Sequence, residues 1–202
     1  MVRHNVCALI ICLSLTGCAG MADTASRMAN IGVVEQEKST FDGATTVKMS
    51  PAVLYREGAT MGVPFKLGAR WNSKTPSHVA LILSYQSDVT VGSSSYVGFT
   101  GLSVNIDGKI SSYRVNAPTS LDNSGYNTVA RTIYTESTNA VVIPLVELKQ
   151  MLAARDCRLR IETNKGYQDA QFSIERIPGG QATAIIPLRE FVGRIEANTP
   201  KL

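Results

Sequence analysis

Cys18 is the residue whose surroundings say most about chemistry, because it closes the run Leu15-Thr16-Gly17-Cys18. A basic residue, Arg3, and an apolar stretch from Val6 to Leu15 precede this run. A basic start, an apolar core and small residues before a cleavage site are typical of a secretory signal peptide. The apolar stretch has about ten residues, whereas a membrane-spanning helix needs about 20. We therefore expect residues 1–17 to be a signal peptide that is removed.

The run Leu15–Cys18 resembles the lipobox of bacterial lipoproteins. The resemblance implies that the Cys18 thiol accepts a diacylglyceryl thioether, that cleavage follows Gly17, and that the freed amine of Cys18 is acylated. Each buried methylene contributes about 0.8 kcal/mol, so several acyl chains hold a protein firmly at a membrane. An aspartate after the cysteine commonly retains such proteins at the inner membrane, and Ala19 stands there instead. The resemblance thus implies lipid anchoring at the outer membrane, with the domain facing the periplasm; the alternative is an ordinary signal peptide that ends near a chance cysteine.

Composition indicates one folded domain without a disulfide. Removal of residues 1–17 leaves 185 residues, enough for one well-cored domain. The formal net charge is +4 and falls to +3 without Arg3, with no long run of either sign, which argues against nucleic-acid binding. Cys157 is the one cysteine outside the signal and the lipobox. It has no partner for an intramolecular disulfide, and we expect it to be a small buried hydrophobe.

Catalytic motifs are hard to find in the mature sequence. His78 and Cys157 do not suffice for a zinc site built from Cys and His, and no metal or cofactor is expected. A Ser-His-Asp triad would need His78, but Gly92-Ser93-Ser94-Ser95 lacks the closing glycine of a nucleophile elbow. We expect His78 to be a strand-end or surface residue. Carboxylates near turns (Asp88, Asp107 and Asp122) keep a cell-wall or glycan hydrolase open as an alternative.

Two features are candidates for binding. Arg70 and Trp71 adjoin at the end of a strand candidate, and Tyr126 lies near a proposed loop; Arg and aromatic side chains are common interface anchors. The second feature is a charged strand region, in which Arg155, Arg158, Arg160 and Lys165 stand against Asp156, Glu162 and Glu175. Mixed cross-strand pairs on a solvated face account for this second group.

The elements that must position these residues are mainly strands. Residues 18–44 are small or polar and predict a lipidated flexible tether, and residues 45–202 predict a single globular domain. The strand candidates are Thr45–Glu57, Val63–Asn72, His78–Tyr85, Thr90–Val97, Leu102–Asn105, Lys109–Val115, Thr128–Thr135 and Ala140–Ile143. Asn116–Asn127 is expected to be a long loop, and Asp107-Gly108 a type I′ hairpin turn.

The C-terminal part predicts a three-stranded meander between two short helices. The helices are expected at Pro144–Ala154 and Pro187–Asn198, each with Pro at its first position. Alternation predicts strands from Cys157 to Glu162, from Ala170 to Glu175, and from Ala182 to Ile186. The fold class expected is α+β, mainly β: an antiparallel β-sandwich or curved sheet with two short helices.

The function expected is that of a lipid-anchored cell-envelope protein, a non-enzymatic binding or accessory module with an envelope protein as its partner. One alternative is the glycan hydrolase with loop carboxylates. Another is an inhibitor or immunity lipoprotein that blocks a partner enzyme, with Asn116–Asn127 as its protruding loop.

Overall fold

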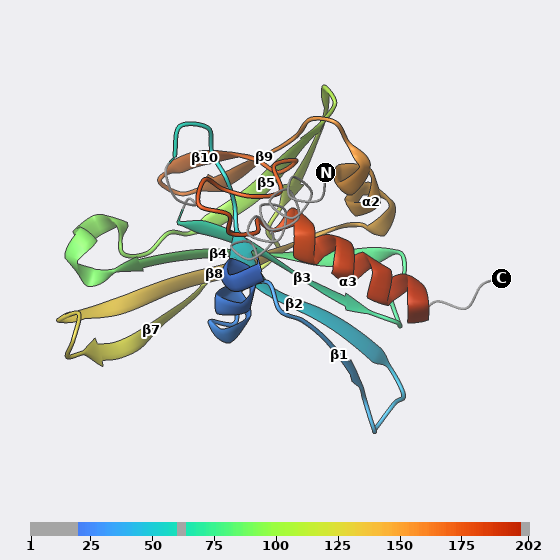
Figure 1. The fold of residues 1–202 in the computed structure, drawn as a ribbon, viewed down its shortest axis with the longest axis horizontal. Helices are drawn as coiled ribbons and strands as arrows, with labels where there is room; N and C mark the ends of the chain where they lie inside the picture. Colours follow the sequence, from blue (N-terminus) through green and yellow to red (C-terminus); the bar gives the residue numbers. More distant parts are fainter. Residues whose placement is uncertain (1–19, 60–63, 199–202) are drawn as a thin grey trace, which may run out of the picture.

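The computed structural model describes residues 20–59 and 64–198, and its strands form two antiparallel sheets (Figure 1). Sheet A has six strands in the order β1 (Val34–Lys38), β2 (Thr45–Val53), β3 (Phe65–Asn72), β4 (His78–Asp88), β8 (Thr132–Pro144) and β7 (Ser120–Asn127). Sheet B has four strands in the order β10 (Gly166–Gln171), β9 (Cys157–Thr163), β5 (Phe99–Ile106) and β6 (Lys109–Arg114). The expected class, α+β with antiparallel sheets and mainly β, is confirmed.

In the part of the chain that the structure describes, four helical segments accompany the sheets. They are the N-terminal helix (residues 20–28), the 3₁₀ segment η1 (Val89–Ser94), α2 (Leu145–Ala153) and α3 (Ile185–Asn198). The two expected C-terminal helices are present as α2 and α3, but neither begins at its proline, because Pro144 precedes α2 and Pro187 is the third residue of α3. Pro144 caps α2 with an extended backbone, φ −60° and ψ 136°, which ends β8 and presets the turn into the helix.

The core lies between the inner faces of the two sheets and the apolar sides of α2 and α3. In β9 the inward residues Cys157, Leu159 and Ile161 are buried, while the alternating Arg158 and Arg160 are exposed. The helices add fully buried side chains to the same core: Leu148, Met151, Leu188, Phe191 and Ile195. Strand alternation therefore places every second residue of β9 on an outward face.

A bulge and a glycine let β2 bend over β3. The register of β2 against β3 shifts between Met49 and Ala52, and Pro51, which donates no backbone hydrogen bond, lies within this bulge. Opposite it, a Cβ on Gly68 would lie 2.8 Å from the Met49 carbonyl oxygen. Any side chain at position 68 would force the two strands apart.

The expected flexible tether over 18–44 is wrong for the described part of that range. Residues 20–28 are helical, and β1 pairs antiparallel with β2, from Val34 opposite Met49 to Lys38 opposite Thr45. Only Val34 of β1 is buried, since the other four residues face solvent at the sheet edge. That exposure removes the alternation of apolar residues by which a strand is predicted. Cys18 and the signal peptide lie outside the described residues.

Other differences concern strands without an apolar pattern. The expected loop Asn116–Asn127 contains β7, whose residues are almost all exposed because β7 is an edge strand paired only with β8. The expected strand Thr90–Val97 is replaced by η1, which Asp88 caps by accepting a hydrogen bond from Thr90 N at 2.8 Å. Thr128–Thr135 and Ala140–Ile143 belong to a turn and one continuous strand, β8.

The expected meander is only half right. β9 and β10 form the hairpin around Lys165-Gly166, but β10 ends at Gln171, and Ala182 makes only an isolated bridge with Arg176. The strand on the other side of β9 is β5, which comes from the first half of the chain. The Asp107-Gly108 turn between β5 and β6 has φ of 48° and 97°, as a type I′ turn requires.

Candidate functional site

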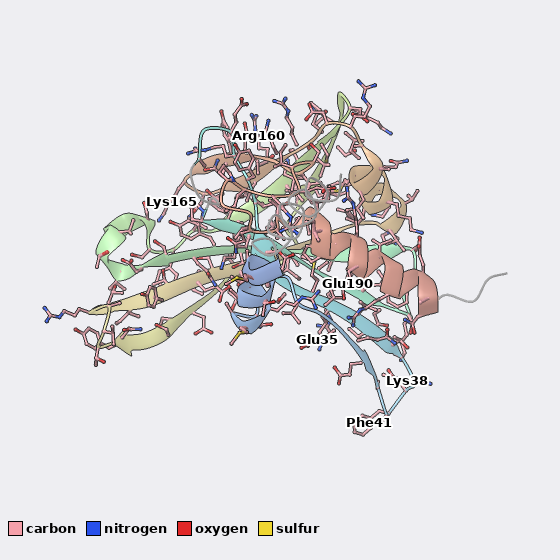
Figure 2. All side chains as sticks on the ribbon, viewed as in Figure 1. Glu35, Lys38, Phe41, Arg160, Lys165 and Glu190 are labelled. Carbon is pink, nitrogen blue, oxygen red and sulfur yellow. The ribbon has the colours of Figure 1, made fainter. Side chains whose placement is uncertain are left out.

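The outer face of sheet B, turned away from the core, carries the candidate site (Figure 2). Its side chains form cross-strand rows, since Arg160 of β9 lies opposite Ser103 of β5 and Asp169 of β10. In the next row, Arg158 lies opposite Asn105 and Gln171. A hollow of about 490 Å³ covers these rows, and Arg56 and Glu57 from the β2–β3 connection line its rim.

Arg160 is the most tightly held side chain of this face. Its Nε and Nη2 donate to Asp169 Oδ1 and Oδ2 at 2.7 and 2.9 Å, and its guanidinium lies 4.1 Å from the centre of the Tyr167 ring. The hydrogen bonds from Arg160 lower the pKa of Asp169, and those same bonds raise the pKa of Arg160. Both groups are therefore charged across the physiological pH range. Figure 2 shows Arg160 at the outer side of sheet B.

A second polar network joins β9, β5 and β6. Ser103 Oγ donates to Glu162 Oε1 at 2.7 Å and lies 2.9 Å from Ser112 Oγ. Arg158 Nε donates to both carboxylate oxygens of Asp156, at 3.2 and 3.1 Å. These bonds fix the orientation of the donors and acceptors along the face. Ser103, Ser112, Arg158 and Glu162 stand on paired strands, and Asp156 directly precedes β9.

The charge of the hollow is balanced. Three arginines (Arg56, Arg158 and Arg160) and three carboxylates (Glu57, Glu162 and Asp169) line it. The exposed side chains of Ile110 and Tyr167 add apolar surface on and beside the same face. A surface that alternates both charges with amides, hydroxyls and an aromatic ring suits a polar partner that itself carries both charges, rather than a polyanion.

The sequence predicts a solvated face for these charged residues, but two of the expected partners pair elsewhere in the structure. Lys165 Nζ donates to the Tyr96 carbonyl at 2.5 Å, and Glu175 pairs with Arg189 of α3. The sequence pattern does not single out Asp169, which accepts two hydrogen bonds from Arg160. Its position directly opposite Arg160 depends on the register of β10, which a sequence without alternation in that strand does not reveal.

Arg70, Trp71 and Tyr126 do not form one surface. Trp71 is buried at 2% exposure, and its indole Nε1 donates to the Pro76 carbonyl at 3.1 Å. Arg70 is exposed because adjacent strand residues point to opposite faces of the sheet. Tyr126 is exposed at the far end of sheet A: it lies opposite Ile133 of β8, whereas the row of Arg70 reaches β8 at Val142. That separation along β8 corresponds to about 30 Å.

The other singled-out residues have structural surroundings. His78 is exposed at the start of β4, where its Nδ1 lies 2.9 Å from Ser77 Oγ. Cys157 is fully buried, and burial raises the pKa of its thiol to about 12, so that it is uncharged. Within residues 20–59 and 64–198, no three His, Cys, Asp or Glu side chains gather in a way that could hold a metal ion.

Of the three carboxylates considered for a hydrolase, Asp88 and Asp107 have structural roles at turns, and Asp122 faces a second carboxylate. Asp88 caps η1, and Asp107 Oδ1 in the β5–β6 turn accepts a hydrogen bond at 2.9 Å from the backbone N of Asp156, which precedes β9. Asp122 of β7 lies directly opposite Glu136 of β8, and both line a hollow of about 430 Å³ on sheet A. Ser84 Oγ donates to Glu136 Oε1 at 2.7 Å.

The chain matches no protein-family model, no curated protein and no solved structure. No helix among the described residues is long and apolar enough to cross a membrane. The sequence run Leu15–Cys18 and the surfaces described above therefore carry the functional argument.

Proposed function

We propose that this protein is a lipid-anchored envelope protein of the outer membrane that acts by binding a protein partner through the outer face of sheet B. Support for the anchor is the run Leu15–Cys18 after a short apolar stretch. Support for binding is one observation above all: the hollow over the rows of Arg158 and Arg160, where the Arg160 guanidinium is oriented by Asp169 and Tyr167. Pre-oriented arginine and tyrosine side chains lose little conformational entropy on binding.

The binding proposal is tested by capture from envelope extracts with matched variants. Wild-type lipoprotein is expected to retain a partner that Arg160→Ala loses, because Ala removes the guanidinium at the centre of the face. Arg70→Ala is the control, since Arg70 is an exposed strand arginine on sheet A. Circular dichroism checks that both variants fold. Equal capture by wild type and Arg160→Ala would refute this assignment of the binding face.

The anchor is tested separately by metabolic labelling. Radiolabelled palmitate is expected in the wild type and absent from Cys18→Ser, because the thioether and the mature amine both depend on Cys18. Label that persists in Cys18→Ser would contradict lipid attachment at this residue.

One observation favours a second candidate, a glycan hydrolase. Asp122 and Glu136 are cross-strand neighbours that line one hollow, and paired carboxylates are the machinery of glycoside hydrolysis. Purified protein would then release soluble sugars from cell-wall glycan, and Glu136→Gln and Asp122→Asn would each abolish release. No release by the wild type would reject the hydrolase.

A further inference from the structure

The N-terminal helix (residues 20–28) is attached to the domain by polar contacts with the segment that leads into α3. Asp23 Oδ1 and Oδ2 accept hydrogen bonds from Arg176 Nη1 and Nη2, both at 2.9 Å. Arg176 Nη1 also donates to the Gly180 carbonyl at 2.6 Å, and Gln181 Nε2 donates to Ser26 Oγ at 3.3 Å. In Figure 1 this helix is the blue coil that lies against the middle of the molecule.

The segment between the helix and β1 is held at both of its ends by hydrogen bonds. Ile31 N donates to the Ser26 carbonyl at 2.8 Å, and Val33 N donates to Ser50 Oγ at 2.8 Å. Between them Gly32 has a φ of 66°, and a Cβ there would lie 3.0 Å from Pro187 Cγ at the start of α3. The chain from Gly20 to β1 is thus a docked part of the domain.

Electrostatics strengthen the same contact. Hydrogen bonding to the Arg176 guanidinium lowers the pKa of Asp23, and the nearby charges of Arg176 and Arg27 lower it further. Arg27 itself lies 3.8 Å from Glu190 of α3. The side chains of Asp23 and Arg176 are 36% and 34% exposed, so the pair is partly shielded from solvent.

The distance from the helix to the lipid attachment point is very short. Cys18 precedes Gly20 by two residues, and two residues span at most about 7 Å. A flexible tether over 18–44 would instead have a root-mean-square length of about 30 Å. The attachment of residues 20–28 therefore decides whether the domain is close to the bilayer or far from it.

We propose that the N-terminal helix docks the domain directly on the phospholipid surface, so that the domain has a fixed orientation at the headgroups instead of swinging on a tether. The surface that meets the lipid is the one around the start of this helix, where Met21 is 76% exposed next to the anchor. This inference rests on the proposed lipidation of Cys18. It makes Arg176 a positioning residue for the whole domain.

The test uses the trypsin-sensitive bond inside the helix, between Arg27 and Met28. The lipidated mature protein, which begins at Cys18, is reconstituted in phosphatidylethanolamine–phosphatidylglycerol vesicles, and mass spectrometry follows release of the fragment that begins at Met28. The wild type is expected to resist cleavage there, whereas Arg176→Ala is expected to be cleaved about two- to fivefold faster. Lys48→Ala, which breaks the exposed pair with Glu37, is the control and is expected to behave as wild type.

Neutron reflectometry on a supported bilayer of the same lipids measures the height of the domain. The wild-type protein layer is expected to begin within about 10 Å of the headgroups. Arg176→Ala frees about 14 residues and is expected to extend the layer outward by about 20 Å.

The outcomes separate this inference from the proposed anchor. Protein that fails to float with vesicles refutes lipidation at Cys18. Protein that floats but is cleaved after Arg27 at the same rate in wild type and Arg176→Ala refutes the docked helix. A wild-type layer as diffuse as that of Arg176→Ala refutes the fixed orientation.

Discussion

Two bidentate Arg–Asp pairs in this molecule have the same chemistry and opposite consequences. Arg160 and Asp169 lie on β9 and β10, strands already joined by a short turn and a ladder of backbone hydrogen bonds. Asp23 and Arg176 join segments 153 positions apart, and no backbone ladder connects them. The first pair orients a guanidinium on a surface that would exist without it, whereas the second holds a segment in place.

The difference teaches that the value of an ion pair depends on what else connects its two ends. Exposed pairs contribute about 0–1 kcal/mol to the unfolding free energy, so neither pair determines the fold. A free energy of this size is nevertheless enough to decide whether a segment with few other contacts is docked or detached. Sheet B should be rigid under conditions in which the N-terminal helix detaches.

The largest effect on the free energy of unfolding is expected in the hydrophobic core, to which neither ion pair contributes. Phe191→Ala removes a side chain of α3 with no exposed surface, which should lower the free energy of unfolding by about 3–5 kcal/mol. Urea unfolding followed by the fluorescence of buried Trp71 measures the loss. Val146→Ala, at an exposed position of α2, is the control and should change stability by less than about 0.5 kcal/mol. A loss below about 1 kcal/mol at Phe191 would mean that polar contacts, not the core, hold α3.

A smaller effect is expected from strain within sheet B. A Cβ on Gly101 of β5 would lie 2.6 Å from the Tyr113 carbonyl oxygen of β6. Gly101→Ala should therefore destabilise the protein by about 1–3 kcal/mol and disturb the rows that carry Arg160. Gly193→Ala is the matched control, because Gly193 lies in α3 with nothing within 4 Å of the added Cβ. This variant should be more stable than the wild type by about 0.5–1 kcal/mol. Equal melting temperatures for the two variants would contradict the close approach of β5 and β6.

The sequence predicts those elements of the fold that bury apolar side chains in a regular pattern. β9, α2 and α3 bury alternate or helically spaced residues, and their patterns placed them correctly. β1 and β7 bury almost no side chains, because they are edge strands held by backbone pairing. Their sequences therefore carry no apolar alternation from which a strand could be predicted. The candidate site was missed for a related reason: Arg160 and Asp169 meet through strand register, and Trp71, although it adjoins Arg70, points into the core.

The two pairs are compared directly by removing one charge from each. Asp23→Asn should speed amide hydrogen exchange in residues 20–28 by about two- to fivefold, since an exposed pair contributes up to about 1 kcal/mol. Asp169→Asn should leave exchange in β9 and β10 unchanged, because the backbone ladder remains. Faster exchange in β10 of Asp169→Asn would mean that the pair, rather than the ladder, holds that strand.

Acid should make the same distinction in the unmodified protein. Asp23 has a lowered pKa in the folded state, so its contribution to docking is complete above the ordinary aspartate pKa of about 4 and is lost as the pH falls below that value. Asp169 also has a lowered pKa, yet its strands are held by backbone bonds. Amide chemical shifts of residues 20–28 should therefore move toward coil values between pH 5 and about pH 2, while those of β9 and β10 stay near their native values. A helix that persists through this range would contradict the role of the Asp23 charge.

Because Cys157 is buried, its chemical modification reports how often the core of the protein opens. Its thiol has no exposed surface and a pKa raised to about 12, so alkylating reagents, which attack the thiolate, find almost none in the native state. Modification then requires that the core around Cys157 open, and the rate of alkylation measures how often this happens. A native domain can thus be compared with any variant by one mass measurement, without a probe being introduced.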